Sequence, residues 1–312
     1  MIEGHVRLFG FGIDTYDNLS NLMFYSVNMP IFFFVSGFLA FKEKLSTSEI
    51  WKRLWQKFSF LVIPAIVFRL FSDLLHGQNP LHVLSDGFGG YWFTITLFEC
   101  FLIYYLVISL VKRNEIQMLI LSVIALFGLV LLSLYGKVGV ALVDLNHLTK
   151  YFQFFVFGLL AMQYRSLFEK TMRNEWIKAL VALSFFTLLV VVNNPIWPSP
   201  VFHLLRDLVL RYLGTFIVVS WFVCNAERFN KDTRINNVIL KIGQCSLAIY
   251  LLQYFFMPNF MAFPDWVSGI DEVTIHVISF GYTFIITTIC MLFISLLSNS
   301  RAVGKYALGI RK

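Results

Sequence analysis

Hydrophobic residues recur along this chain in long uninterrupted runs, without the alternation of a half-buried strand or the polar stripe of a soluble helix. Runs of about 20 apolar residues are long enough for an α-helix to cross the hydrocarbon core of a membrane. Nine such spans are predicted, near residues 21–41, 58–75, 91–111, 117–135, 150–164, 177–195, 205–225, 237–257 and 273–297. The pattern therefore predicts an all-α polytopic membrane protein.

The first of these runs contains residues that are unusual in a lipid-facing helix. Pro30 removes a backbone donor, which is tolerated in lipid where neighbouring helices or waters satisfy the freed carbonyl. Ser36 and Gly37 form a small face that another backbone can approach closely. We expect this helix to pack inside a bundle; the alternative is an ordinary lipid-facing span that happens to contain these residues.

Composition agrees with a membrane protein throughout. Of the 312 residues, 58% are hydrophobic and 14% are charged, whereas a soluble domain carries about 25% charged residues. No polar segment is long enough for a soluble domain, so residues 1–312 are predicted to form a single membrane domain. The four cysteines lie in or beside apolar runs without metal-ligand spacing, which indicates free thiols and no metal site.

The basic residues divide the connections between spans into two sets. Nineteen of the 25 Lys and Arg residues fall in residues 42–57, 112–116, 165–178, 226–241 and 299–312. The alternate connections contain Lys137 alone. The positive-inside rule places the first set in the cytoplasm, together with the C-terminal tail 299–312. The net charge of +7 is read as this topology signal, and no nucleic-acid partner is expected.

The segment before the first full span raises a topological question. As a helix, residues 1–12 would reach only about 18 Å at 1.5 Å per residue, against a hydrocarbon core of about 30 Å. We expect them to be the outer half of a truncated first transmembrane helix whose start lies upstream, giving about ten helices. The alternative is a short re-entrant or interfacial segment.

Ionisable residues at membrane depth are costly and mark candidate sites. His5 lies in the first segment, two residues before Arg7, near the expected outer membrane face. A lone histidine is more often structural than catalytic. Glu99 lies about a third of the way down its span with no local partner, so it either handles a proton or pairs with an arginine from elsewhere.

Three basic residues, Lys52, Arg53 and Lys57, alternate with tryptophans at a cytoplasmic helix entry. They are either interfacial anchors or a phosphate-binding entrance, because Lys and Arg hold phosphate oxygens with charge-assisted bonds.

Two further charged groups lie at the outer ends of spans. Arg69 precedes Asp73 by four residues, so the two can pair on one helix face. Arg206, Asp207 and Arg211 form a similar cluster. Such groups are either structural clips or the walls of a polar cavity.

Five segments, in order, resemble the membrane acyltransferase family 3 over nearly the whole chain. They are residues 29–38 (MPIFFFVSGF), Lys52, Arg53 and Lys57 leading to 61–64 (LVIP), 91–93 (YWF), 151–158 (YFQFFVFG) and 246–254 (SLAIYLLQY). Members of that family are ten-helix proteins of the bacterial inner membrane. They transfer an acyl group, commonly acetyl from acetyl-CoA, to a hydroxyl of an envelope polysaccharide, glycolipid or similar acceptor.

The resemblance assigns roles to residues that the pattern alone leaves open. Gly4 and His5 resemble the end of the family motif of an Arg, ten residues and a His, which makes His5 the candidate catalytic residue; the Arg would fall upstream of Met1. The family has a histidine in the segment that corresponds to residues 246–254, where this chain has Gln253. We therefore assign no histidine role to position 253.

The remaining roles follow from the substrates. Lys52, Arg53 and Lys57 become candidates for binding the CoA donor, which is a substrate and not a bound cofactor. Trp92, Glu99, Arg69 and Arg206 are candidates for the acceptor site or for stabilising the developing oxyanion. A transporter or flippase of an envelope glycan intermediate is the main alternative. A sensor or scaffold, or transfer of succinyl or a longer acyl chain, also stays open.

Overall fold

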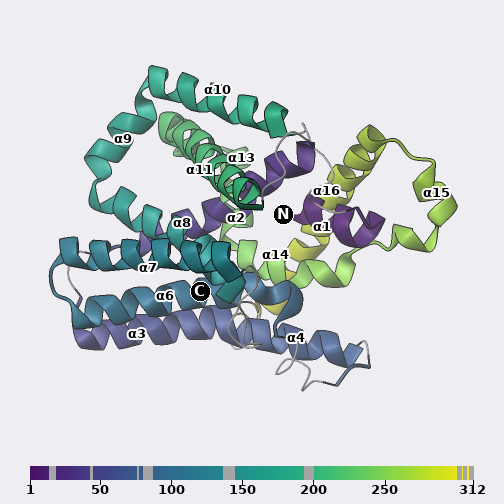
Figure 1. The fold of residues 1–312 in the computed structure, drawn as a ribbon. Helices are drawn as coiled ribbons and strands as arrows, with labels where there is room; N and C mark the ends of the chain where they lie inside the picture. Colours follow the sequence, from purple (N-terminus) through teal and green to yellow (C-terminus); the bar gives the residue numbers. More distant parts are fainter. Residues whose placement is uncertain are drawn as a thin grey trace. The chain divides into compact units, whose positions relative to one another are not determined.

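A computed structural model describes residues 1–13, 19–42, 45–75, 77–79, 87–135, 145–192, 200–300, 304 and 308. Most of the C-terminal tail and much of the predicted outer connections lie outside these residues. Within the described ranges the regular elements are all helical (Figure 1). They are α1 (Ile2–His5), η1 (Val6–Gly10), α2 (Leu19–Ala40), α3 (Thr47–Lys57), η2 (Phe58–Val62), α4 (Ile63–Leu75), η3 (Gly89–Tyr91), α6 (Trp92–Leu110), α7 (Asn114–Tyr135), α8 (Leu145–Gln163), α9 (Arg165–Arg173), α10 (Glu175–Val192), α11 (Pro200–Cys224), α12 (Ala226–Phe229), α13 (Arg234–Gln244), α14 (Ser246–Leu252), η4 (Gln253–Phe256), η5 (Phe260–Ala262), α15 (Pro264–Ser268) and α16 (Glu272–Leu297).

Six helical stretches in the described residues are long and apolar enough to cross a membrane. They are Leu22–Ala40, Thr47–Leu75, Gly89–Leu110, Asn114–Leu132, Leu205–Cys224 and Glu272–Leu297, and a bent pair within residues 234–262 would make a seventh. The prediction of an all-α, multi-pass membrane protein is confirmed. Helices α8 and α10 lie at two more of the predicted positions, and the total of about ten spans stays a prediction.

The chain divides into two compact units, which are described separately below. The first unit comprises residues 1–24, 63–80 and 230–312, and the second comprises residues 25–62 and 81–229.

In the second unit, α2 and α8 approach closely through glycine. A Cβ atom added at Gly37 would lie 2.0 Å from the carbonyl oxygen of Phe155, and one added at Gly158 would lie 2.0 Å from that of Phe34. No larger side chain fits there without separating the helices, which is the role of small residues at helix contacts in membranes. Pro30 lies inside α2, which continues through it, and Ser36 is half-buried beside Gly37.

The other helices of the second unit pack in neighbouring pairs, with α7 on α8, α6 on α8, α3 on α6, and α10 on α11 (Figure 1). Aromatic side chains fill the interior, and Phe101, Phe154 and Phe155 are almost completely buried. The Phe-rich runs therefore serve the helix interfaces as well as the lipid-facing surface.

The helix predicted near residues 58–75 begins earlier than expected, because Thr47–Leu75 forms one long helical stretch. Ser46 and Glu49 form a capping box at its start, which stabilises a helix N-terminus. Residues Phe58–Val62 are π-helical directly before Pro64. Proline cannot donate to the carbonyl four residues earlier and its ring crowds that carbonyl, which accounts for the irregular turn.

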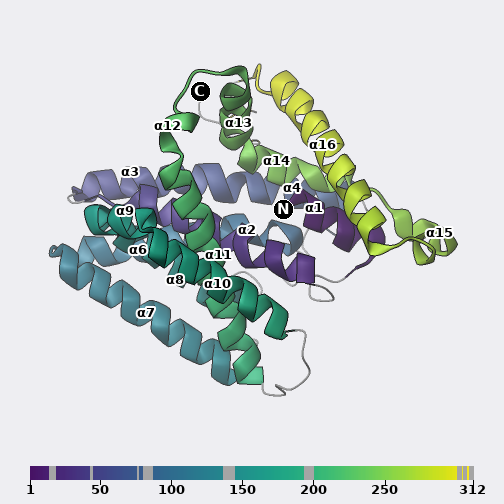
Figure 2. The same cartoon turned by 90° about the horizontal axis from the view of Figure 1, so that it is seen from above.

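In the first unit, α1 and η1 pack against α16, and α14 packs against α16 and α4 (Figure 2). The span predicted near residues 237–257 corresponds to a bent pair of helical stretches, which counts as a seventh span if the pair crosses the membrane together. The chain bends by 59° between α13 and the helical stretch that begins at Ser246. Helix α13 has no buried residue, and it places Arg234 and Lys241 among apolar residues at helical spacing. Such an amphipathic helix favours an interface over the hydrocarbon core.

Candidate functional site

His5 lies in a small aromatic environment within the first unit. Its imidazole is half-buried, with its centroid 5.2 Å from the ring of Tyr254 and 5.7 Å from that of Phe9. Positions 5 and 9 share one helix face because they are one turn apart. This face of the N-terminal segment therefore presents the histidine to η4.

Gln253 is the polar side chain beside the imidazole. It is fully buried and donates through Nε2 to the carbonyl oxygen of Tyr250 at 3.1 Å. Its Oε1 atom and the Nδ1 atom of His5 are both buried, and neither has a hydrogen-bond partner within the part of the chain that the structure describes. Buried polar atoms usually have hydrogen-bond partners. In the described part of the chain, Oε1 of Gln253 and Nδ1 of His5 are therefore two unsatisfied polar atoms at the candidate catalytic residue.

The opposite face of the same segment carries a charged network. Arg7 is 1% exposed, and its Nη1 atom lies 2.8 Å from Nδ1 of His276. The Nη1 atom also lies 3.9 Å from the Glu3 carboxylate, and the Nη2 atom lies 3.7 Å from the Glu272 carboxylate. The Nδ1 atom of His276 lies 3.1 Å from Glu3. The network fixes α1 and η1 to the start of α16.

Sequence reasoning did not single out this network. Glu3 and Arg7 are four residues apart, as are Glu272 and His276, so each pair can lie on one helix face. The four-residue spacing within each pair is the one feature of the sequence that indicates these local contacts. Nothing in the sequence indicates that two segments almost 270 residues apart pair with each other, because only tertiary packing brings them together.

The three basic residues considered for donor binding lie on α3 in the second unit. Lys52 is exposed, Arg53 lies near the side chain of Tyr105, and the Nζ atom of Lys57 lies 4.0 Å from the Phe101 ring centroid. Two of the three are thus held against α6, and one is free to meet solvent.

Arg69 belongs to the first unit, like His5. Its Nε atom lies 3.2 Å from the Asp73 carboxylate, which is 2% exposed, so the two residues form the expected pair along α4. Arg69 thus provides an ion-pair partner for the buried Asp73 carboxylate, which is a structural role.

The other three acceptor or oxyanion candidates lie in the second unit. Trp92 stacks on His147 with centroids 3.7 Å apart and on Tyr151 at 5.5 Å. Glu99 is half-buried on α6. Arg206 pairs with Asp207 at 2.7 Å. The candidates thus fall into two groups, one in each unit.

Comparison with known proteins identifies the family. A sequence model of the acyltransferase 3 family, described as an acyltransferase domain, matches residues 1–298 of the 312. The chain belongs to the acyltransferase 3 family. Comparisons with curated proteins and with solved structures find no match. The family and the apolar helices together make this a multi-pass membrane protein of an acyltransferase family, in agreement with the resemblance described above.

Proposed function

We propose that this acyltransferase 3 protein moves an acyl group, in the first place acetyl, from acyl-CoA to a hydroxyl of an envelope polysaccharide, glycolipid or similar acceptor. The observation that carries the proposal is the family match over residues 1–298, which includes the segment that holds His5. The site of action is the bacterial inner membrane with a cytoplasmic C-terminus, and a reporter fused after Lys312 tests that orientation.

His5 acts as the general base in this proposal. The acceptor hydroxyl oxygen attacks the thioester carbonyl carbon while its proton moves to the imidazole. The carbon–sulfur bond then breaks, and the leaving CoA thiolate receives the proton, which yields an ester and free CoA. A neutral imidazole suits this step because its usual pKa, about 6.5, lies near ambient pH.

Gln253 positions the base. Donation of the Nδ1 proton of His5 to Oε1 of Gln253 would satisfy both buried atoms, which have no other partner among the described residues. The lone pair of Nε2 would then face the substrate, as in sites where a third group orients the catalytic base. The network around Arg7 holds the segment from its other side.

The remaining candidates serve the two substrates. Lys52, Arg53 and Lys57 would contact the CoA phosphates, with Lys52 the most accessible of the three. Arg69 or Arg206 would stabilise the developing oxyanion. Trp92 would form a wall of the acceptor site, and Glu99 would take part in proton handling.

The test is the O-acyl content of envelope glycans and glycolipids, measured by mass spectrometry. Wild type is compared with a deletion and with a chromosomal His5→Ala allele, because the native gene preserves any sequence upstream. Loss of a general base costs roughly 10²- to 10⁴-fold in rate, so His5→Ala is expected to lose the same acyl groups as the deletion.

Arg173→Gln is the matched control, since this exposed residue lies on α9 and takes no part in the proposed chemistry. Immunoblots of the membrane fraction must show equal protein in all strains. Unchanged acylation with a glycan accumulating inside the deletion strain would favour the transporter or flippase alternative. Loss of acylation in the deletion but not in His5→Ala would remove His5 from the mechanism.

A further inference from the structure

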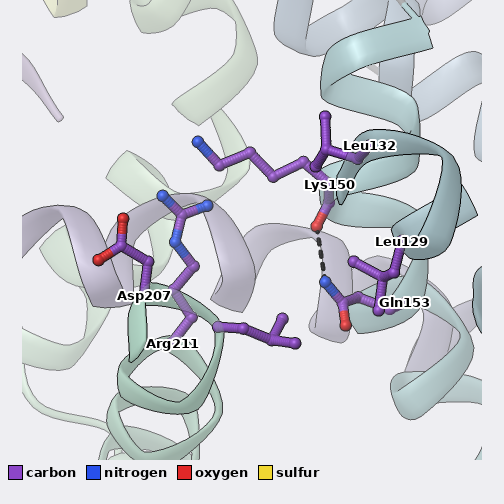
Figure 3. Close-up of a pocket in the computed structure, with 7 residues that line it drawn as sticks. Leu129, Leu132, Lys150, Gln153, Asp207 and Arg211 are labelled. Atoms are coloured by element: carbon purple, nitrogen blue, oxygen red, sulfur yellow. Dashed lines mark hydrogen bonds between the residues drawn. The ribbon is translucent and has the colours of Figure 1, made fainter. Parts of the chain in front are cut away.

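A pocket in the second unit lies among α7, α8 and α11, apart from any role assigned above. Its lining residues are Leu129, Leu132, Lys150, Gln153, Asp207, Leu208 and Arg211. The cavity measures about 70 Å³, which exceeds the space that a single water needs. Figure 3 shows the Lys150 amine and the Arg211 guanidinium both reaching into the space between α8 and α11.

Arg211 is a buried cation, and no carboxylate of the described residues lies within 4 Å of its guanidinium. It is 5% exposed, and its Nη1 atom has no hydrogen-bond partner there. Lys150 does not relieve the charge, because the two cations repel each other. An isolated buried charge is costly, so an anion bound in this pocket would be stabilised by the positive charge of Arg211.

The neighbouring polar groups are already engaged. Asp207 accepts from Nε and Nη2 of Arg206 at 3.0 and 2.7 Å. Gln153 donates to the carbonyl oxygen of Lys150 at 3.0 Å and accepts from the Tyr212 hydroxyl at 3.1 Å. Asp207 also attracts Lys150, but its carboxylate is hydrogen-bonded to Arg206, and the two cations of the lining outnumber its one carboxylate.

An aromatic ring holds both cations in place. The Cζ atom of Arg211 lies 5.4 Å from the Tyr151 ring centroid, and the Nζ atom of Lys150 lies 5.8 Å from it. Cation–π contacts at this range orient a charge without neutralising it. The donors are thus preorganised and still available to a ligand.

We propose that this pocket binds a phosphate group of the acceptor or of an associated lipid. A guanidinium offers a planar fork of donors to phosphate oxygens, and an ammonium adds a compact second charge. Two positive charges match the charge of a phosphate better than that of a single carboxylate. The assignment to the acceptor rests on the proposed function, whereas the phosphate site itself does not.

The test uses the purified full-length chain, delipidated in a phosphate-free non-ionic detergent. Thermal melts are recorded with glycerol 3-phosphate, with phosphatidylglycerol, and with acetate at equal ionic strength. Wild type is expected to melt at a higher temperature with a phosphate compound and not with acetate. Arg211→Gln should weaken the apparent affinity at least tenfold, while the exposed-site control Arg173→Gln should respond like wild type.

The two phosphate arms separate the sources, since a response to phosphatidylglycerol alone indicates a lipid headgroup and a response to glycerol 3-phosphate indicates a soluble or glycan-linked phosphate. An equal response to acetate, or a phosphate response that Arg211→Gln leaves intact, would overturn the proposal. If Arg211→Gln does not fold, Lys150→Gln replaces it in the same assay with the same expectation. Phosphate binding together with unchanged acylation in His5→Ala cells would refute His5 as the base and leave this site standing.

Discussion

Two buried arginines, one in each unit, meet opposite surroundings. Arg7 is 1% exposed and has the carboxylates of Glu3 and Glu272 within 4 Å. Arg211 is 5% exposed and, among the described residues, contacts the face of Tyr151 while Lys150 repels it. Both guanidinium groups have buried nitrogen atoms without a hydrogen-bond partner among the described residues, but only Arg7 has carboxylates within 4 Å there.

This difference separates a structural charge from a ligand-binding charge. A buried cation with carboxylate partners stabilises the arrangement once the desolvation cost has been met. For a buried cation without carboxylate partners, the desolvation free energy is not offset until a ligand supplies the negative charge. Removing each arginine should therefore change stability in different directions.

The largest effect is expected for Arg7→Met. This substitution leaves the buried Glu3 carboxylate without its cation, and breaking a buried pair costs about 3–5 kcal/mol. The melting temperature in detergent should fall by on the order of 10 °C. Arg173→Met, at an exposed site, is the control and should melt close to wild type. An unchanged melting temperature for Arg7→Met would show that the network contributes no stability.

An intermediate effect, opposite in sign, is expected for Arg211→Met in the absence of ligand. The substitution removes an unmatched charge and its repulsion from Lys150, at the loss of one cation–π contact worth about 1 kcal/mol. The delipidated variant should melt a few degrees higher than wild type. A decrease as large as that of Arg7→Met would mean that Arg211 serves the fold, as Arg7 does.

The smallest effect is expected at the N-cap of α16, the helix to which the Arg7 network attaches. Asp271 accepts hydrogen bonds from the backbone and hydroxyl of Thr274 at 2.9 and 2.7 Å, which hold the pKa of its carboxyl below its usual range. A carboxyl with a lowered folded-state pKa stabilises the fold at neutral pH and loses that contribution as the pH falls through the folded-state value.

Asp271→Ala should therefore lower the melting temperature slightly at neutral pH, and the difference from wild type should shrink as the pH falls below about 3.9, the usual pKa of an Asp carboxyl. Asp271→Asn is the matched comparison, since it keeps the cap without the charge. A difference between Asp271→Ala and wild type that stays constant across this range would mean that the carboxyl charge does not contribute.

Local features of the fold were largely readable from the sequence. The apolar runs predicted helices where the structure has them, since a run of about 20 apolar residues has few stable alternatives in a membrane. The small face at Gly37 and the i,i+4 pair of Arg69 and Asp73 were also visible, because both depend on residues close in sequence. The bend after α13 was missed because hydropathy averages over a window and does not register where a helix breaks.

The membrane class, the helical content and the family can all be read from the amino-acid sequence, because each depends on patterns along the chain. Which charges are matched depends on the folded arrangement. It paired Arg7 with His276 and placed Gln253 beside His5. It also placed Lys150 and Arg211 at one pocket, where the acidic lining residue, Asp207, pairs with Arg206. Electrostatic partners depend on distances in space, and those distances are set by helix packing and not by separation along the chain.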